Sequence, residues 1–323
     1  MEKIPMIRAV TNSTQHWSLV IAASCALGAL SSSADAACSI GKIAELKITM
    51  DGSRPMLDAK VNGMRGKFTV DSSSFYNIVS GAGASRSGLR LKPPPAWLAA
   101  KGPDGKPLLS IGVANDFVVD DLHFKNIEFL AGGNELAGSD GVVGQPMFQG
   151  YDVEYDLANR VIRLMRPENC GDASLAYWTS PQQPYSVVDI NPTTSAQPFV
   201  SGVAQLDGTQ IRVLFDTGAN ASRISPQAAK QAGLKLNAAE LGEPGTSTGM
   251  GRPTVKTYGA PFGTLKVGDE EILNPHLRVG DTREGTDMLL GADFFLSHRI
   301  YVSNSQHKVY FTYNGGTVFS ASR

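Results

Sequence analysis

The sequence has few charged residues and no concentration of positive charge. Asp, Glu, Lys and Arg together make up 18% of its 323 residues, and the formal net charge is −1. A surface that binds nucleic acid needs clustered Lys and Arg side chains to neutralise phosphates. The chain contains no such run, so we expect that nucleic acid is not a partner.

Metal-ligating residues are scarce as well. The five His and three Cys residues show no Cys-x-x-Cys or His-x-x-x-His spacing. Such short spacings are typical of metal centres, because they place two ligands side by side. We therefore expect neither a bound metal nor another cofactor.

The apolar run near the N-terminus, residues 17–30, is short for a membrane span, which needs about 20 apolar residues. Lys3 and Arg8 precede it, and Ala34-Asp35-Ala36 follows it. A positive start, a short apolar run and an Ala-x-Ala site are typical of a secretory signal peptide. We expect cleavage after Ala36, export to the bacterial periplasm or to the medium, and no membrane contact afterwards. An uncleaved signal anchor is the alternative.

Cleavage there would leave only two cysteines, Cys38 and Cys170. An even pair in an exported chain favours a disulfide. A bridge that closes so long a loop contributes about 4–5 kcal/mol in the chain-entropy treatment of the unfolded state. Two free thiols at the surface are the alternative.

Long helical periodicities are absent, and short alternating segments take their place. Residues 44–50 alternate between polar and apolar side chains and end at a turn. Residues 57–61 and 66–70 flank Asn62-Gly63, a strong hairpin signal. Together with frequent Gly and Pro, these segments predict an all-β chain.

The second half of the chain repeats the pattern of the first half. Residues 211–215 lead to Asp216 as residues 66–70 lead to Asp71, and Asp207-Gly208 takes the place of the Asn-Gly turn. Two further pairs of segments correspond: 140–148 with 287–295, and 151–164 with 298–311. An internal repeat of this length predicts two similar lobes.

The repeat also predicts the domain boundaries. We expect a signal peptide over residues 1–36, an N-terminal lobe over 37–170, a linker over 171–187 and a C-terminal lobe over 188–323. The linker is rich in Pro, Gly, Gln and Ser and has little strand pattern. Its Tyr177 and Trp178 are candidates to pack it against a lobe. We expect the mature protein to be a monomer.

One stretch carries a family resemblance. Residues 213–219 read Val-Leu-Phe-Asp-Thr-Gly-Ala, and the apolar-apolar-Gly run Leu289-Leu290-Gly291 follows at a distance. This combination resembles one lobe of the retropepsin-type aspartic proteases. Such a lobe supplies half of an active site, and the repeat identifies Asp71 as the partner of Asp216. The resemblance therefore implies a bilobal acid-protease fold made of two retropepsin-like β-barrel lobes fused in one chain, as in the pepsins.

The resemblance also implies a reaction. Two carboxyl groups in contact cannot both ionise cheaply, so the pair Asp71 and Asp216 would hold one proton between them. The ionised member would take a proton from water, and the protonated member would bind the scissile carbonyl group. We expect an aspartic endopeptidase that acts on an extended polypeptide, with Ser72, Ser73, Thr217 and Gly218 supporting the acids.

Ser73 departs from the family pattern, because Asp-Thr/Ser-Gly has Gly at this position, as the second lobe has Gly218. The first lobe keeps its acid and the hydroxyl of Ser72 and loses the glycine. If Ser73 fits in the loop, its N–H still points at the Asp71 carboxylate, and its hydroxyl is a second donor. A catalytically weak or inactive relative that binds peptides without cutting them is the main alternative.

The middle of each repeat predicts a flap over the cleft. Residues 100–107 and 245–253 are Gly- and Pro-rich between apolar arms, which suits mobile hairpins that close over a substrate. The second of them also contains Gly-x-Ser-x-Gly around Ser247, the nucleophile motif of serine hydrolases. That motif needs a strand before it and a helix after it, so a serine hydrolase using Ser247 is the lesser alternative.

Overall fold

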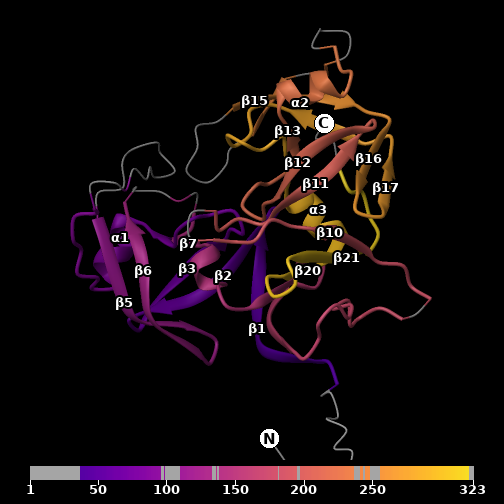
Figure 1. Ribbon diagram of the computed structural model, residues 1–323. Coiled ribbons are helices and arrows are strands. Elements are labelled where there is room, and N and C mark those ends of the chain that lie inside the picture. Colours follow the sequence, from indigo (N-terminus) through magenta and orange to yellow (C-terminus); the bar gives the residue numbers. More distant parts are fainter. Residues whose placement is uncertain are drawn as a thin grey trace, which may run out of the picture. The chain divides into compact units, whose positions relative to one another are not determined.

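Short β-strands form nearly all of the regular structure in the computed structural model (Figure 1). The structure describes residues 37–319 apart from 96–97, 99–109, 133–135, 137, 181, 195–196, 236–240, 243 and 248–254. The predicted signal peptide over residues 1–36 lies outside this range, and so does the predicted first-lobe flap over 100–107. Among the described residues, no helix is long and apolar enough to cross a membrane.

The first lobe is a closed barrel. Its strands follow one another in the order β2-β3-β7-β4-β6-β5, and β5 pairs with β2 to close the ring. Its strands are β2 (Arg54–Val61), β3 (Met64–Val70), β4 (Ile78–Val79), β5 (Ser110–Val119), β6 (Leu122–Ala131) and β7 (Gly141–Val143). Alternating apolar residues on β2 and β3, Phe68 and Val70 among them, fill the interior.

The second lobe repeats this plan with more interruptions. Its sheet runs β14-β15-β18-β13-β19-β12-β11-β16-β17. Its strands are β11 (Ser201–Leu206), β12 (Thr209–Phe215), β13 (Arg223–Ile224), β14 (Pro244–Ser247), β15 (Val255–Pro261), β16 (Thr264–Val267), β17 (Glu270–Leu273), β18 (His276–Val279) and β19 (Met288–Leu290). The long β5–β6 hairpin of the first lobe corresponds here to two shorter antiparallel pairs, β15 with β18 and β16 with β17. Gly263 and Pro275 lie at the breaks, where neither residue favours a continuous strand.

Pairing across the barrels confirms the repeat. β3 runs parallel to β7 with Val70 opposite Val143, and β12 runs parallel to β19 with Phe215 opposite Leu290. A short helix follows β4 and β13 in each lobe: α1 (Gly81–Arg86) and α2 (Pro226–Gln231). Each begins after a serine, Ser80 or Ser225, whose side chain accepts a hydrogen bond from an N–H of the first turn.

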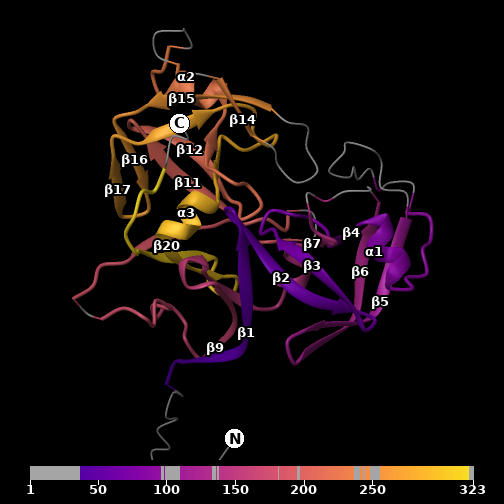
Figure 2. The same ribbon diagram turned by 180° about the vertical axis from the view of Figure 1, so that it is seen from behind.

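A six-strand section of the larger sheet joins the lobes (Figure 2). Strands from the two halves, β8 (Asp152–Asp156) and β20 (His298–Ser303), pair at its centre, with Tyr155 opposite Ile300. Around them lie β10 (Ser186–Asp189), β21 (Lys308–Tyr313), β9 (Val161–Glu168) and β1 (Ser39–Asp51). The remaining short helices are η1 (Gln145–Met147), η2 (Leu157–Asn159) and α3 (Ala292–Ser297). Residues 37–323 accordingly form one compact unit.

The predicted disulfide is confirmed, because Cys38 and Cys170 are bonded. They lie just outside β1 and β9, which pair antiparallel from Ser39 opposite Glu168. The bridge therefore fastens the first described residues to the end of the first lobe.

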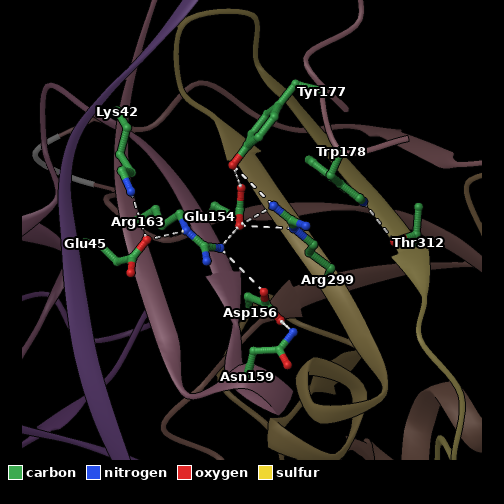
Figure 3. Close-up of polar contacts among 10 residues, drawn as sticks. All are labelled: Lys42, Glu45, Glu154, Asp156, Asn159, Arg163, Tyr177, Trp178, Arg299 and Thr312. Carbon is green, nitrogen blue, oxygen red and sulfur yellow. Dashed lines mark hydrogen bonds and ion pairs between the residues drawn. The ribbon is translucent and has the colours of Figure 1, made fainter. Parts of the chain in front are cut away.

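Tyr177 and Trp178 of the predicted linker contact the joining sheet, where Tyr177 reaches a buried acid (Figure 3). Glu154 on β8 is fully buried, and its carboxylate accepts hydrogen bonds from Arg163, Arg299 and Tyr177. Arg299 comes from the second lobe and Tyr177 from the linker. A buried carboxylate is costly unless it is paired and hydrogen-bonded, so this cluster ties linker and lobes together. Trp178 adds a hydrogen bond to Thr312, at 3.0 Å.

Candidate active site

Two acids stand at equivalent strand ends. β3 ends at Val70 and β12 at Phe215, so Asp71 and Asp216 follow directly. The N–H of Asp71 donates to the Val143 carbonyl (3.0 Å), and the N–H of Asp216 donates to the Leu290 carbonyl (2.9 Å). Both acids are nearly buried, with 6% and 8% of their surface exposed. The parallel strands β7 and β19 therefore fix the two acids in the same way.

Hydrogen bonds exchanged between the lobes hold the two acid-bearing loops together. The Ser72 hydroxyl donates to the Phe215 carbonyl, and the Thr217 hydroxyl donates to the Val70 carbonyl, each at 2.8 Å. Each hydroxyl oxygen also accepts the backbone N–H of the other residue, Thr217 or Ser72, at 3.0 Å. These four buried bonds are reciprocal, so neither loop can shift without breaking bonds to the other.

Each carboxylate is held by donors from its own loop. Asp216 Oδ1 accepts the backbone N–H groups of Gly218 (3.0 Å) and Ala219 (3.1 Å). Asp71 Oδ1 accepts the backbone N–H of Ser73 (2.8 Å) and its hydroxyl (3.0 Å). Both Ser73 donors expected from the sequence therefore reach the acid. The two acids are oriented by different kinds of donor.

The Asp71 carboxylate lies against the second lobe. A Cβ added to Gly218 would stand 2.4 Å from Asp71 Cγ and 2.4 Å from its Oδ2. Nothing larger than glycine fits there without moving the acid. Gly218 thus marks the place where the two half-sites meet.

The electrostatic setting of Asp71 favours its protonated form. Burial, and next the negative charge of Asp216, raise the pKa of Asp71 to about 6. The two Ser73 donors and the positive charge of Arg283 pull in the opposite direction. Asp71 therefore holds a proton more readily than an exposed aspartate does.

Comparison with known proteins agrees with this geometry. Residues 203–294, which contain Asp216-Thr217-Gly218 and Leu289-Leu290-Gly291, match the sequence model of the family described as Aspartyl protease. This part of the chain is therefore similar to the aspartyl protease family. No curated protein matches its sequence.

Two solved structures of this aspartic protease group are similar. An aspartic proteinase from Irpex lacteus covers 86% of this chain and 98% of its own, at 11% identity and a TM-score of 0.51. At that identity the likeness concerns the fold alone. A retropepsin-like aspartic protease from Rickettsia conorii covers 41% of this chain and 95% of its own, at 21% identity and a TM-score of 0.29. The predicted all-β, bilobal acid-protease fold is confirmed.

Ser73 fits in its loop without backbone strain. Neither Ser73 nor Gly218 has a positive φ, so the loop conformation itself does not demand glycine at either position. The demand at Gly218 comes from the close approach of Asp71. Position 218 must therefore be glycine because Asp71 lies against it, whereas the loop of the first lobe accepts a serine at position 73.

The sequence did not indicate two residues that hold the ends of β7 and β19, next to the acid-bearing loops, by hydrogen bonds. Asn77 Oδ1 accepts the N–H of Gly144, and Ser222 Oγ accepts the N–H of Gly291. These two residues occupy equivalent places in the repeat, just before β4 and β13. Extending the comparison of the two halves past the acid loops would have revealed them. In the second lobe, the backbone N–H and the hydroxyl of Ser222 also donate to the half-buried Asp293.

The rival serine site does not have the required surroundings. Ser247 is the last residue of β14, which forms an antiparallel hairpin with β15. A nucleophile elbow instead needs a strand that turns into a helix. Of the second predicted flap, residues 245–247 belong to this hairpin strand and residues 248–253 lie outside the described range.

Proposed function

We propose that this aspartic protease homologue is an active endopeptidase, in which Asp71 and Asp216 hydrolyse a peptide bond by activating water. The observation that supports it most is the reciprocal bonding of Ser72 and Thr217, which joins two buried, strand-end acid loops. Two acids held in this way form a pre-organised pair, and little further ordering is needed when the substrate binds.

The two acids have separate roles in the first step. Asp216, whose carboxylate accepts two backbone N–H groups, acts as the general base and takes a proton from water. Asp71, whose pKa is raised, is the protonated member and gives its proton to the scissile carbonyl oxygen. The water oxygen bonds to the carbonyl carbon, and a neutral tetrahedral diol results.

The second step returns both protons. The diol collapses as Asp71 recovers its proton from a hydroxyl group and the carbonyl group forms again. Asp216 gives the water-derived proton to the leaving nitrogen, and the C–N bond breaks. No acyl-enzyme is formed, and both acids end in their starting states.

The substrate of such a site is an extended polypeptide. Export after signal cleavage and a monomeric state belong to the same proposal, and the bonded pair Cys38 and Cys170 is compatible with an oxidising compartment. A peptide-binding protein without activity is the second candidate, because Ser73 replaces the glycine of the family motif.

An assay of the chain that begins at Ala37 separates these functions. We expect it to degrade an unfolded protein at acidic pH, the Asp216→Asn variant to be inactive, and the Ser247→Ala variant to keep its activity. Peptide binding without any cleavage would refute the endopeptidase and support the binding protein. Loss of activity in Ser247→Ala would restore the serine hydrolase.

A further inference from the structure

A buried glutamine holds the acid-bearing loop of the first lobe from one side. Gln145 is the first residue of η1, just after β7, and its side chain is buried. Its Nε2 donates a hydrogen bond to the Ser72 carbonyl at 2.6 Å, and its backbone N–H donates to the Ser74 carbonyl at 3.0 Å. Gln145 therefore fixes the carbonyl groups of the residues on both sides of Ser73.

The bond to Ser72 acts on Asp71 through one peptide group. The carbonyl of Ser72 and the N–H of Ser73 belong to the same planar group, and in a trans peptide they point in opposite directions. The carbonyl accepts the side chain of Gln145, and the N–H donates to Asp71 Oδ1 at 2.8 Å. A donor that fixes the carbonyl on one side therefore directs the N–H to the acid on the other. Hydrogen bonds in such a chain also polarise one another.

This arrangement makes the two oxygens of the Asp71 carboxyl group unequal. Oδ1 accepts both the N–H and the hydroxyl of Ser73. A protonated carboxyl group carries its proton on one oxygen and accepts hydrogen bonds at the other. The proton of Asp71 therefore belongs on Oδ2, which a Cβ added to Gly218 would meet at 2.4 Å. A rotation of the Ser72–Ser73 peptide group would remove this distinction.

The second lobe holds its acid without a side chain of this kind. Ala292 corresponds to Gln145 in the repeat and has no side-chain donor. Its backbone N–H makes the equivalent bond, to the Ala219 carbonyl at 2.8 Å. The Asp216 carboxylate accepts a second backbone N–H, from Ala219 at 3.1 Å. The corresponding N–H of the first lobe, that of Ser74, donates to the backbone carbonyl of its acid at 3.2 Å.

We propose that Gln145 is a positioning residue, which holds the Asp71 carboxyl group in its productive orientation through the Ser72–Ser73 peptide group. The inference rests on the proposed endopeptidase function and adds a residue that acts on the same site. It explains how the first lobe orients its acid with one backbone N–H, where the second lobe uses two.

Two substitutions at position 145 separate the hydrogen bond from the volume of the side chain. Gln145→Met keeps the length of the side chain and removes the donor. We expect kcat to fall by about tenfold with KM unchanged, because the acid loses the contact that orients it. Gln145→Glu supplies a donor in acid, since a buried carboxyl group stays protonated below about pH 4 and can then donate to the Ser72 carbonyl. Its kcat at that pH should stay within a few-fold of the wild type.

Gln149→Met is the matched control. Gln149 is the same residue type a little further along the chain, and its side chain is exposed. This variant should keep the wild-type kcat. A wild-type kcat in Gln145→Met would overturn the inference. A folded Gln145→Glu variant that is as slow in acid as Gln145→Met would also overturn it, because the restored donor would then have no effect.

Amide hydrogen exchange tests the same contact without a substrate. The N–H groups of Ser73 and Gly218 donate to Asp71 and Asp216 respectively, and NMR measures how fast each exchanges in wild type and in Gln145→Met. We expect the Ser73 N–H to exchange about tenfold faster, relative to that of Gly218, in the variant. This ratio within one protein is independent of its folded fraction.

The exchange ratio separates this inference from the proposed function. If the wild type cuts nothing but the ratio changes in Gln145→Met, the endopeptidase fails and the positioning contact stands. If the wild type cuts peptides, and neither kcat nor the ratio responds to Gln145→Met, the positioning role fails alone.

Discussion

The two lobes share a strand arrangement, but they hold their acids with different hydrogen-bond donors. Asp216 is held by two backbone N–H groups, whereas Asp71 is held by the N–H and the hydroxyl of one serine. Asp71 also lies against Gly218 of the opposite lobe and carries a raised pKa. A repeated backbone thus holds its two acids with different donors, and the proposed mechanism uses Asp71 as the general acid and Asp216 as the general base.

The lobes also differ in their sheets. The first is a closed ring with two uninterrupted long strands, β5 and β6, whereas no pairing among the described residues closes the sheet of the second lobe. The second breaks both corresponding strands, near Gly263 and Pro275. The strands of the two lobes therefore differ more than the two acid-bearing loops do. The hydrogen bonds that Ser72 makes across the lobes match those that Thr217 makes.

Removal of the disulfide should have the greatest effect on stability. Among the described residues, only the first half of the chain has a disulfide. Cys38→Ser with Cys170→Ser should lower the free energy of unfolding by about 4–5 kcal/mol, since the bridge closes a long loop in the unfolded state. Denaturant titration of the mature chain measures this, with wild type under reductant as the control. An unchanged unfolding midpoint would show that the bridge does not restrict the unfolded state.

Gly218→Ala tests the close approach of the two half-sites. The new Cβ would meet the Asp71 carboxylate at 2.4 Å, so the acid must move. A displacement of about 1 Å costs about a hundredfold in rate, and we expect kcat to fall by about this factor with little change in KM. Ala219→Gly at the next position is the control. Full activity in Gly218→Ala would mean that the acids do not meet at this residue.

Removing one hydroxyl from each lobe compares the contributions of the two cross-lobe residues to stability. Ser72→Ala and Thr217→Val each remove a hydroxyl that donates once and accepts once. Each should destabilise the protein by about 1–3 kcal/mol, because a buried N–H and a buried carbonyl lose their partners. Thermal unfolding measures both, with Thr217→Ser as the control. Strongly unequal losses would contradict the reciprocal arrangement.

Ser73 gives the smallest expected effect. Ser73→Ala removes the hydroxyl donor to the Asp71 carboxylate and keeps the N–H donor. Loss of a donor to the charged form raises the pKa of Asp71 further. The proposed mechanism needs Asp71 protonated, so we expect wild-type activity to fall as pH rises through about 6 and the alkaline limb of kcat/KM to move to higher pH in the variant.

Ser73→Gly restores the residue of the second lobe, and its activity at acidic pH should stay within a few-fold of the wild type or rise. A pH–rate profile of both Ser73 variants measures these effects. A large loss in Ser73→Gly would show that the hydroxyl has become part of the mechanism.

The fold around the two acids could be predicted because the sequence repeats the same pattern of turn, strand and acid in its two halves. The turn before each acid strand and the acid itself recur in both halves, so the sequence predicts two similar lobes, as the sheets show. The pairing of Asp71 with Asp216 in one catalytic site stays a prediction. The even cysteine count likewise predicted the bond between Cys38 and Cys170. The limits of the linker remain a prediction.

Contacts between the lobes could not be predicted, because they depend on how two folded units meet. Nothing in the sequence indicates that the hydroxyl of Ser72 reaches the carbonyl of Phe215, or that Arg283 is enclosed by Phe75 and Phe199. Each of these contacts joins residues far apart in the chain and has no periodic pattern. Gly218 was assigned to the loop from the motif, but the reason it must be glycine is a contact with the other lobe.

We propose that each lobe supplies one acid to a single shared site. Double-mutant kinetics test whether the two acids act together. The kcat of one peptide is measured for wild type, Asp71→Asn, Asp216→Asn and the double variant, with folding checked by thermal unfolding. If the acids act as a unit, each single substitution lowers kcat by at least about a thousandfold, and the double variant is no worse than either. Activity that survives in Asp71→Asn, or losses that multiply in the double variant, would show that the lobes do not share one site.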